Sequence, residues 1–170
     1  MNRTLAFLLS AAAALPLAVA AIPAAQAEAA AKDWTKIVAK TPEGGFRVGN
    51  PDAALKLVEY GSLTCDHCAH FAEEAMPKLL GEYVKSGRVS FEFRNFIRDP
   101  ADLTATLLSR CAGPDDFFAL THRYLTSQPQ WFGKLQAMSE ADREAINALP
   151  PTERLARFAA MAGLDAAAAK

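Results

Sequence analysis

The sequence predicts an α/β protein in which a strand–helix–strand unit is followed by a layer of helices. An apolar run at 55–60 precedes a helical periodicity that lasts to about residue 86, and residues 89–96 then alternate between apolar and polar. Beyond residue 100 only helical patterns follow, separated by Gly-Pro, Gln-Pro and Pro-Pro pairs. A strand, a helix and a strand of these lengths imply a right-handed crossover and a parallel strand pair.

The first 27 residues have the pattern of a secretory signal peptide. A short basic start is followed by an apolar run at 5–21, and Ala25 and Ala27 place small residues before a cleavage site at Glu28. A retained membrane helix is the weaker interpretation, because the run is rich in alanine and a good cleavage site follows it. We therefore expect an exported chain without stable membrane insertion after cleavage.

The elements before residue 61 are justified by turn signals and apolar runs. Residues 28–45 are rich in alanine and then in turn residues, which predicts a flexible lead-in. Phe46–Gly49 is short and alternating, which favours an edge strand, and Asn50-Pro51-Asp52 ends it as a turn. Leu55–Tyr60 is the predicted central strand. The strand–helix–strand core is placed at 46–100.

The helix that follows is predicted to begin near Cys65 and to end at Ser86-Gly87, with a bend at Pro77. Strict alternation at 89–96 predicts a half-buried strand. The helical layer is placed at 101–164, before a tail at 165–170. It is predicted to contain helices at 103–111, 114–126, 139–148 and 152–162, with N-caps at Asp102, Ser139 and Thr152.

The charge of the chain argues against binding to nucleic acid or anionic lipid, and its cysteine content bears on disulfide formation. The formal net charge is −1, so the chain lacks the basic footprint that nucleic acid or anionic lipid requires. The chain has three cysteines, an odd number, so one is left over if two of them pair. Disulfides persist in the oxidising compartments that exported proteins enter.

The sequence Cys65-Asp66-His67-Cys68 at the start of a helix indicates a redox site. A thiol in the first turn faces unpaired backbone N–H groups, equivalent to roughly half a positive charge, which favour the thiolate. Cysteines three apart on one helix also face the same side. We expect Cys65 to be the attacking thiol and Cys68 to resolve the mixed disulfide. A protonated His67 would favour the Cys65 thiolate, whereas Asp66 would oppose it.

Glu59 is the second residue to which the pattern assigns chemistry. It shares a strand face with Leu55 and Leu57, where an acid is costly unless it has a task. From there it could lie beneath the disulfide and relay a proton to or from Cys68. In the competing interpretation the end of the strand is solvated and Glu59 faces water. The sequence leaves both open.

Metal binding is the alternative function, as a non-catalytic zinc or copper thiol protein. Cys65, His67, Cys68 and His70 are four possible ligands within six residues. A zinc site, however, usually draws its second ligand pair from a separate segment, and the two histidines do not face with the cysteines on one helix. The third cysteine, Cys111, continues an apolar helical spacing, so a buried inert thiol is expected; half of a second disulfide is the alternative.

Residues 61–71, with Glu59 before them and Pro77 after them, resemble the DsbA-like branch of the thioredoxin superfamily. The likeness extends to Arg94-Asn95-Phe96 and to Gln128-Pro129-Gln130-Trp131, and it covers roughly residues 44 to 165.

The resemblance implies a thioredoxin-like fold with a helical insertion and a periplasmic thiol:disulfide oxidoreductase. It makes Cys65 the nucleophile, Cys68 the resolving thiol and Glu59 the buried acid beside them. It also implies unfolded or partly folded secreted proteins as substrates and a membrane disulfide oxidase as reoxidant. No cofactor beyond the cysteine pair is implied.

Two departures from the family pattern carry their own expectations. Asp66 stands where the family's oxidants usually have proline, and its charge should raise the pKa of Cys65 relative to such a site. Nothing after Pro150-Pro151 resembles the family's cis-proline loop, hairpin and last helix, so we expect a fold that is incomplete at its C-terminus. Leu55–Tyr60 would then be an exposed sheet edge.

Overall fold

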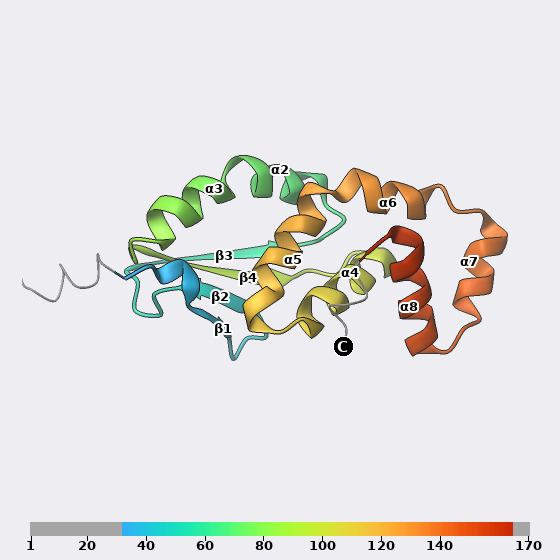
Figure 1. Cartoon of the computed structure of the whole chain (residues 1–170), viewed down its shortest axis with the longest axis horizontal. Coiled ribbons are helices and arrows are strands. Elements are labelled where there is room, and N and C mark those ends of the chain that lie inside the picture. The colour runs from blue at the N-terminus through green and yellow to red at the C-terminus, as the bar shows by residue number, and fades with distance from the viewer. Residues whose placement is uncertain (1–31, 165–170) are drawn as a thin grey trace, which may run out of the picture.

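A four-stranded sheet and the helices around it make up residues 32–164, the part of the chain that the computed structural model describes (Figure 1). The proposed signal peptide and the tail at 165–170 lie outside the described residues. Along this part, the strands come first and a helical layer follows, as the sequence predicts. The helices α6, α7 and α8 lie beyond one end of the sheet (Figure 1).

The sheet has the strand order β1-β2-β4-β3, with β1 at Val38–Lys40, β2 at Phe46–Gly49, β3 at Leu55–Gly61 and β4 at Val89–Asn95. The pairs β1–β2 and β2–β4 are antiparallel. The pair β3–β4 is parallel, which confirms the parallel pair predicted from the sequence.

The segment expected to be a flexible lead-in is ordered where the structure describes it. A short 3-10 helix, η1 (Trp34–Lys36), is capped by the Asp33 side chain, and β1 follows it directly. β1 pairs with β2 through Val38 and Val48. The prediction of a flexible lead-in was therefore wrong for the described part of this segment. The prediction that β2 is an edge strand was also wrong, because β2 pairs with β1 on one side and with β4 on the other.

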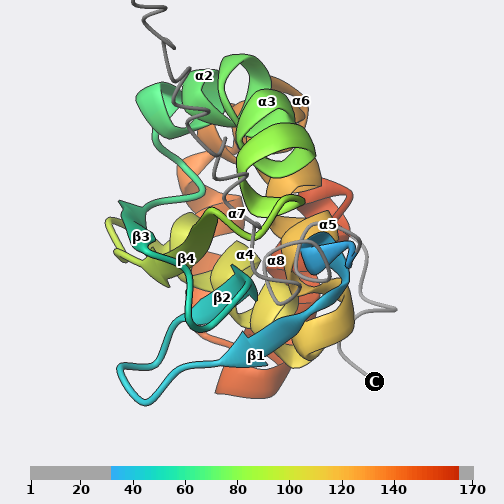
Figure 2. The same cartoon turned by 90° about the vertical axis from the view of Figure 1, so that its left-hand side faces the viewer.

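Within the described residues β3 pairs with β4 alone, so its other side is a free edge (Figure 2). Leu55 is 65% exposed and Tyr60 66% exposed. The strand expected to be central thus lies at the edge of the described sheet. Its C-terminal end is the part that carries Glu59 and leads to the cysteines.

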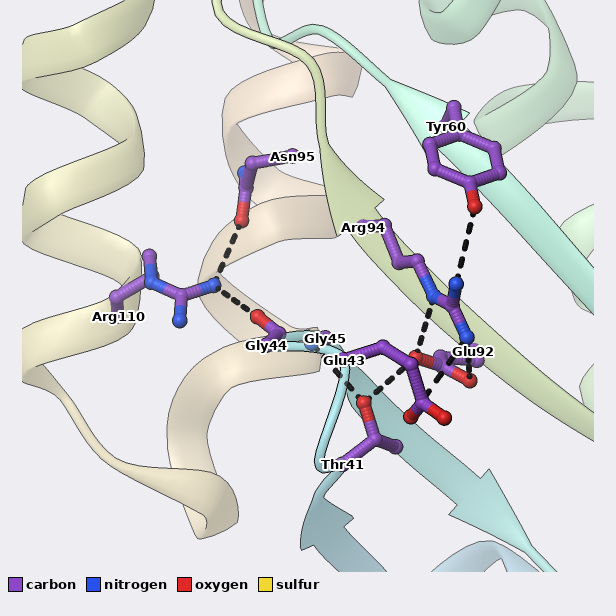
Figure 3. A network of polar contacts seen from close by, with 9 residues as sticks. All are labelled: Thr41, Glu43, Gly44, Gly45, Tyr60, Glu92, Arg94, Asn95 and Arg110. Atoms are coloured by element: carbon purple, nitrogen blue, oxygen red, sulfur yellow. Dashed lines mark hydrogen bonds and ion pairs between the residues drawn. The ribbon is translucent and has the colours of Figure 1, made fainter.

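β4 is buried on both faces, not on one as its alternation suggested. Phe91 and Phe93 face α5 (Pro114–Thr126), and the opposite face is closed by the β1–β2 loop. There Glu92 accepts hydrogen bonds from the Thr41 hydroxyl at 2.6 Å and from the Arg94 Nε at 2.7 Å (Figure 3). These hydrogen bonds offset the cost of burying the Glu92 carboxylate, which the alternating pattern had placed on a solvent-exposed face.

The helix after the cysteines is divided into three parts. α2 covers Asp66–Glu74, α3 covers Met76–Lys78, and η2, a π-helical segment, covers Leu79–Val84. The division falls at Ala75, just before Pro77, whose ring cannot continue a straight helix. The predicted bend is confirmed, and the chain leaves the helix at Gly87, which has a positive φ of 79°.

The helical layer contains α4 (Pro100–Cys111), α5, α6 (Gln128–Gln136), α7 (Glu140–Asn147) and α8 (Pro151–Ala162). α6 was not expected, because Gln-Pro was interpreted as a break; proline in the first turn instead starts a helix. Ser139 caps α7 as predicted. The other two caps differ from the prediction: α4 is capped by Asp99 and α8 begins after Pro150.

The core joins the sheet to the helical layer through α5. The Phe117 ring stacks on Phe46 with ring centroids 3.9 Å apart and lies 6.1 Å from Phe93. These rings belong to one cluster of buried residues that continues into α6 and α8. Among residues 32–164 no helix has the length and apolar character needed to cross a bilayer.

Candidate active site

The two cysteines lie where the chain leaves β3 and enters α2. The Gly61 carbonyl accepts a hydrogen bond from the Phe96 N–H at 2.8 Å, which ties the end of β3 to the segment after β4. Cys65 is the N-cap residue of α2, with an extended backbone at φ −93° and ψ 121°. Its carbonyl accepts the helical bond from the Ala69 N–H at 3.0 Å. The Cys65 side chain therefore projects at the start of the helix, as the sequence predicts.

The surroundings of Cys65 favour its thiolate. Partial burial works against ionisation, but the N–H groups of Cys68 and His67 and the Cys68 thiol hydrogen bond to the sulfur, and together they lower its pKa. The positive charge of Arg98 adds to this effect. A thiol with a lowered pKa is both a better nucleophile at neutral pH and a better leaving group.

The surroundings of Cys68 act in the opposite direction. Burial raises the pKa of Cys68 to about 11, against the opposing hydrogen bond from the Ser62 N–H. The neighbouring Cys65 sulfur and the Glu59 carboxylate raise it further. Two thiols one helical turn apart thus differ strongly in acidity, and the reduced pair carries its negative charge on Cys65.

Glu59 lies beside Cys68, on the face of β3 that the sequence assigned to it. Burial raises the pKa of Glu59 to about 7, and a hydrogen bond with the Cys68 thiol opposes part of that rise. The carboxyl is half-buried and opposite Phe93 in the neighbouring strand. Of the two interpretations that the sequence left open, this position agrees with the acid that lies beneath the thiols.

Gly61 makes this close arrangement possible. A Cβ at this position would overlap the Phe93 ring and would come within 3.0 Å of the Glu59 Oε1. The glycine therefore leaves room for the aromatic ring and the carboxyl to occupy the same end of the sheet.

The remaining residues of the motif are exposed. His67 contributes its backbone N–H to the Cys65 sulfur, while its side chain faces outward. Asp66 is exposed and is not among the groups with the largest effect on the pKa of Cys65, which is lowered overall in spite of the aspartate. His70 pairs with Glu74 at 3.7 Å on the helix surface.

Three residues important to this site were not found from the sequence. Asp102 was expected to cap α4, but its fully buried carboxyl contacts the loop before Cys65. Gln128 appeared only as part of the resemblance and donates to the Cys65 carbonyl at 3.1 Å. Arg98 had no distinguishing pattern. One signal in the sequence could have revealed Asp102. Asp99 and Asp102 both lie near the start of α4, and a helix start needs only one capping residue, so the second aspartate was available for another role.

The described residues bear on the metal-binding alternative and on the expected burial of Cys111. Among residues 32–164, no group of three or more His, Cys, Asp and Glu side chains could hold a metal ion. Cys111, expected to be buried, is exposed on α4. The prediction of a buried thiol was wrong, because Leu103 and Leu107, from whose spacing it followed, are themselves exposed.

Comparison with known proteins places this geometry in a family. The family model described as thioredoxin matches residues 41–168. The chain belongs to the thioredoxin family. Among solved structures, the protein-disulfide isomerase of Novosphingobium aromaticivorans shares 38% identity with it at a TM-score of 0.63, over 69% of this chain and 60% of that one.

Within the thioredoxin family the likeness is to the DsbA-like branch, as the sequence indicated. The alpha-DsbA1 of Wolbachia pipientis has a TM-score of 0.52 and 29% identity, over 75% of this chain and 58% of that one. The predicted fold, thioredoxin-like with a helical insertion, is thereby confirmed.

The curated relatives of this thioredoxin-family chain are considerably longer. A Rickettsia bellii protein named as a candidate protein-disulfide oxidoreductase is 35% identical over 97 residues, which are 56% of this chain and 38% of that protein. The chain spans about four tenths of the length of such relatives.

Proposed function

We propose that this chain is a periplasmic thiol:disulfide oxidoreductase that donates the Cys65–Cys68 disulfide to exported proteins. The observation that carries the proposal is the opposite perturbation of the two thiols: the pKa of Cys65 is lowered and that of Cys68 is raised to about 11. The names of the relatives agree with this chemistry. The proposed location rests on the likeness and on the signal peptide predicted at residues 1–27.

In the first step, a thiolate of an unfolded substrate attacks the Cys65 sulfur of the disulfide. The Cys65–Cys68 bond breaks, a mixed disulfide forms between the substrate and Cys65, and Cys68 leaves as a thiolate. Because the pKa of Cys68 is about 11, this thiolate takes up a proton at neutral pH. Glu59, with a pKa of about 7 and a hydrogen bond to Cys68, is the proposed donor.

In the second step, another thiolate of the substrate attacks the substrate sulfur of the mixed disulfide. The substrate disulfide forms and Cys65 leaves as a thiolate, which its lowered pKa favours. The substrate has then lost two electrons and the cysteine pair has gained them. A membrane disulfide oxidase that passes electrons to quinone is the proposed reoxidant, as in the family that the chain resembles.

The deciding experiment is the redox equilibrium of the purified protein with glutathione, followed by oxidation of a reduced, unfolded protein in stoichiometric amounts. A potential above about −200 mV with transfer to the substrate supports a disulfide donor, whereas about −270 mV would indicate a reductase. Cys65→Ala should abolish both signals. Cys111→Ala, at an exposed thiol outside the site, is the matched control and should leave both unchanged. Absence of a reversible couple would refute the proposal.

A further inference from the structure

The loop before the cysteines is held by side chains of the helical layer. Residues 62–64 are buried, so the hydroxyls of Ser62 and Thr64 and the backbone N–H groups of this loop need partners within the protein. Asp102 of α4 is the main acceptor. Its carboxyl accepts from the Leu63 N–H at 2.9 Å and from the Ser62 hydroxyl at 2.6 Å. The Ser62 oxygen in turn accepts from the Thr64 N–H at 3.2 Å.

The same carboxyl also fixes the segment that carries a cation near Cys65. The Arg98 N–H donates to Asp102 at 3.0 Å. Next to it, Asp99 accepts from the Thr64 hydroxyl at 2.6 Å and caps α4 through the Asp102 N–H at 2.8 Å. One end of α4 thus contacts both chain segments that adjoin the thiols.

A second attachment comes from the start of α6. The buried Gln128 amide donates to the Leu63 carbonyl at 2.8 Å and to the Cys65 carbonyl at 3.1 Å. Cys65 is the N-cap residue of α2, so this amide fixes the point at which the helix begins. The Gln128 amide group thereby gives a partner to the buried Leu63 carbonyl and a second partner to the half-buried Cys65 carbonyl.

These attachments matter to the thiols because the groups they hold act on the sulfurs. The reduced pair carries its negative charge on Cys65, so the groups held around that sulfur matter most. Arg98 lowers the pKa of Cys65, and the Gln128 amide fixes the helix start whose N–H groups bond to the same sulfur. Hydrogen bonds to an ionised sulfur are roughly twice as strong as those between neutral groups. In the disulfide neither sulfur is charged. The held loop therefore stabilises the reduced protein more than the oxidised one.

We propose that Asp102 and Gln128 are positioning residues that set the redox equilibrium of the Cys65–Cys68 pair by holding the Ser62–Cys65 loop from the helical layer. The inference deepens the proposed function and rests on it. Neither side chain touches a reacting sulfur; each acts through the loop backbone. The helical layer thus tunes the pair, in addition to completing the core.

The test compares Asp102→Asn and Gln128→Met with two matched controls. Asn keeps the shape of Asp102 but replaces one acceptor oxygen by a donor, and Met removes both donors of Gln128. Ser109→Ala removes a fully buried hydroxyl of α4 that bonds only within its helix, to the Thr106 carbonyl. Gln130→Met makes the second substitution at an exposed position of α6.

For each protein the equilibrium constant with glutathione and the thermal unfolding of both redox forms are measured. We expect Asp102→Asn and Gln128→Met to shift the equilibrium threefold to tenfold toward the disulfide, and to destabilise the reduced form more than the oxidised form. The controls should stay within twofold. If Asp102→Asn does not fold, Gln128→Met decides alone, because it removes donors without placing a new polar group at the site.

Equal loss of stability in both redox forms, with the equilibrium within twofold of the unsubstituted protein, would overturn the inference. The readout does not require substrate turnover. A protein that forms the disulfide but oxidises no substrate contradicts the proposed function alone, and the variants still test the positioning role. A protein that forms no Cys65–Cys68 disulfide contradicts both.

Discussion

At the scale of single residues, the site depends on the different surroundings of two thiols that lie one helical turn apart. Cys65 lies at the helix start, where N–H groups reach its sulfur, and Cys68 lies one turn deeper beside a carboxyl. The helix position of Cys65 was predictable, because a strand followed by helical periodicity places it there. The depth of Cys68 was not, since it depends on residues that are distant in the sequence.

The difference between the thiols can be measured by alkylation. In Cys68→Ser only Cys65 of the pair reacts, and its rate should rise with a midpoint below the ordinary thiol value of about 8.5. In Cys65→Ser the midpoint for Cys68 should stay above the ordinary thiol value, because burial is the main cause of its raised pKa and the Cys65 sulfur only adds to it. Iodoacetamide reaction followed by mass spectrometry across pH 5 to 11.5 resolves both. Coincident midpoints would contradict the assignment, and a Cys111→Ala background removes the exposed third thiol.

Glu59 should leave a signature in the pH dependence of stability. Its pKa is raised from 4.5 to about 7 in the folded protein, so between these values the folded state binds more protons than the unfolded state. The free energy of unfolding contributed by this group is therefore highest below pH 4.5 and falls as pH rises through 7. After allowance for partial exposure, we expect a fall of about 2 kcal/mol.

Urea unfolding of the reduced protein at pH 5 and at pH 8 checks this expectation. Glu59→Gln should remove the fall, so that the difference between the two proteins grows with pH in favour of the glutamine variant. Glu74→Gln, at an exposed carboxyl on α2, is the control and should follow the unsubstituted protein. A parallel pH dependence in Glu59→Gln would show that Glu59 is solvated.

At the scale of elements, β3 positions the active site although it is an edge strand. Its C-terminal end carries Glu59 and leads into the cysteine loop, while its outer edge has no strand partner among the described residues. Natural proteins usually protect such edges with charge, because unpaired N–H and C=O groups recruit other chains. β3 has Lys56 and Glu59 but also exposed Leu55 and Tyr60.

A charge at the start of β3 should therefore reduce self-association. We expect Leu55→Lys to raise, by at least twofold, the highest protein concentration at which the purified chain remains monomeric. Sedimentation velocity measures this concentration. Leu55→Thr, which retains β-propensity without charge, should have a smaller effect. The glutathione equilibrium should not change in either variant, because Leu55 lies at the end of β3 away from Cys65. Unchanged association in Leu55→Lys would show that the edge is not the contact.

The elements also show where sequence patterns succeed and fail. β3, β4 and α5 were placed correctly because each has a clear periodicity and α5 begins and ends at turn signals. α6 was missed because its second residue is a proline, which ends one helix and starts another equally well. β1 was missed because three residues carry too little pattern to be recognised without their partner strand.

At the scale of the whole molecule, the sheet and the helical layer share one core. Phe117 connects them, since its ring is fully buried and stacks on Phe46 of β2. The sequence predicted the two parts but not this junction, because stacking between distant rings leaves no local signal. The same reason explains why Asp102 and Gln128 were not recognised as parts of the site.

A shared core predicts cooperative unfolding. Phe117→Ala should lower the free energy of unfolding by about 3–5 kcal/mol while sheet and helical layer still unfold together. Trp34, near the sheet, and Trp131, in α6, report on the two parts when each is replaced in turn by phenylalanine. Phe118→Ala, at a half-buried ring beside Phe91, should cost less. Separate transitions for the two tryptophans would contradict a single core.

The polar network on the outer face of β4 has a consequence for how the strands find their pairing. Glu92 and Arg94 are two residues apart and so share one face (Figure 3). Phe91 and Phe93 share the other face, against α5. A slip of β4 by one residue would turn both charges toward the Phe117 ring and expose the phenylalanines. Taking both charges out of water and away from the Thr41 hydroxyl would cost more than their mutual attraction returns, so such a state should not persist. The ion pair thereby helps to specify the one register in which β4 pairs with both β2 and β3.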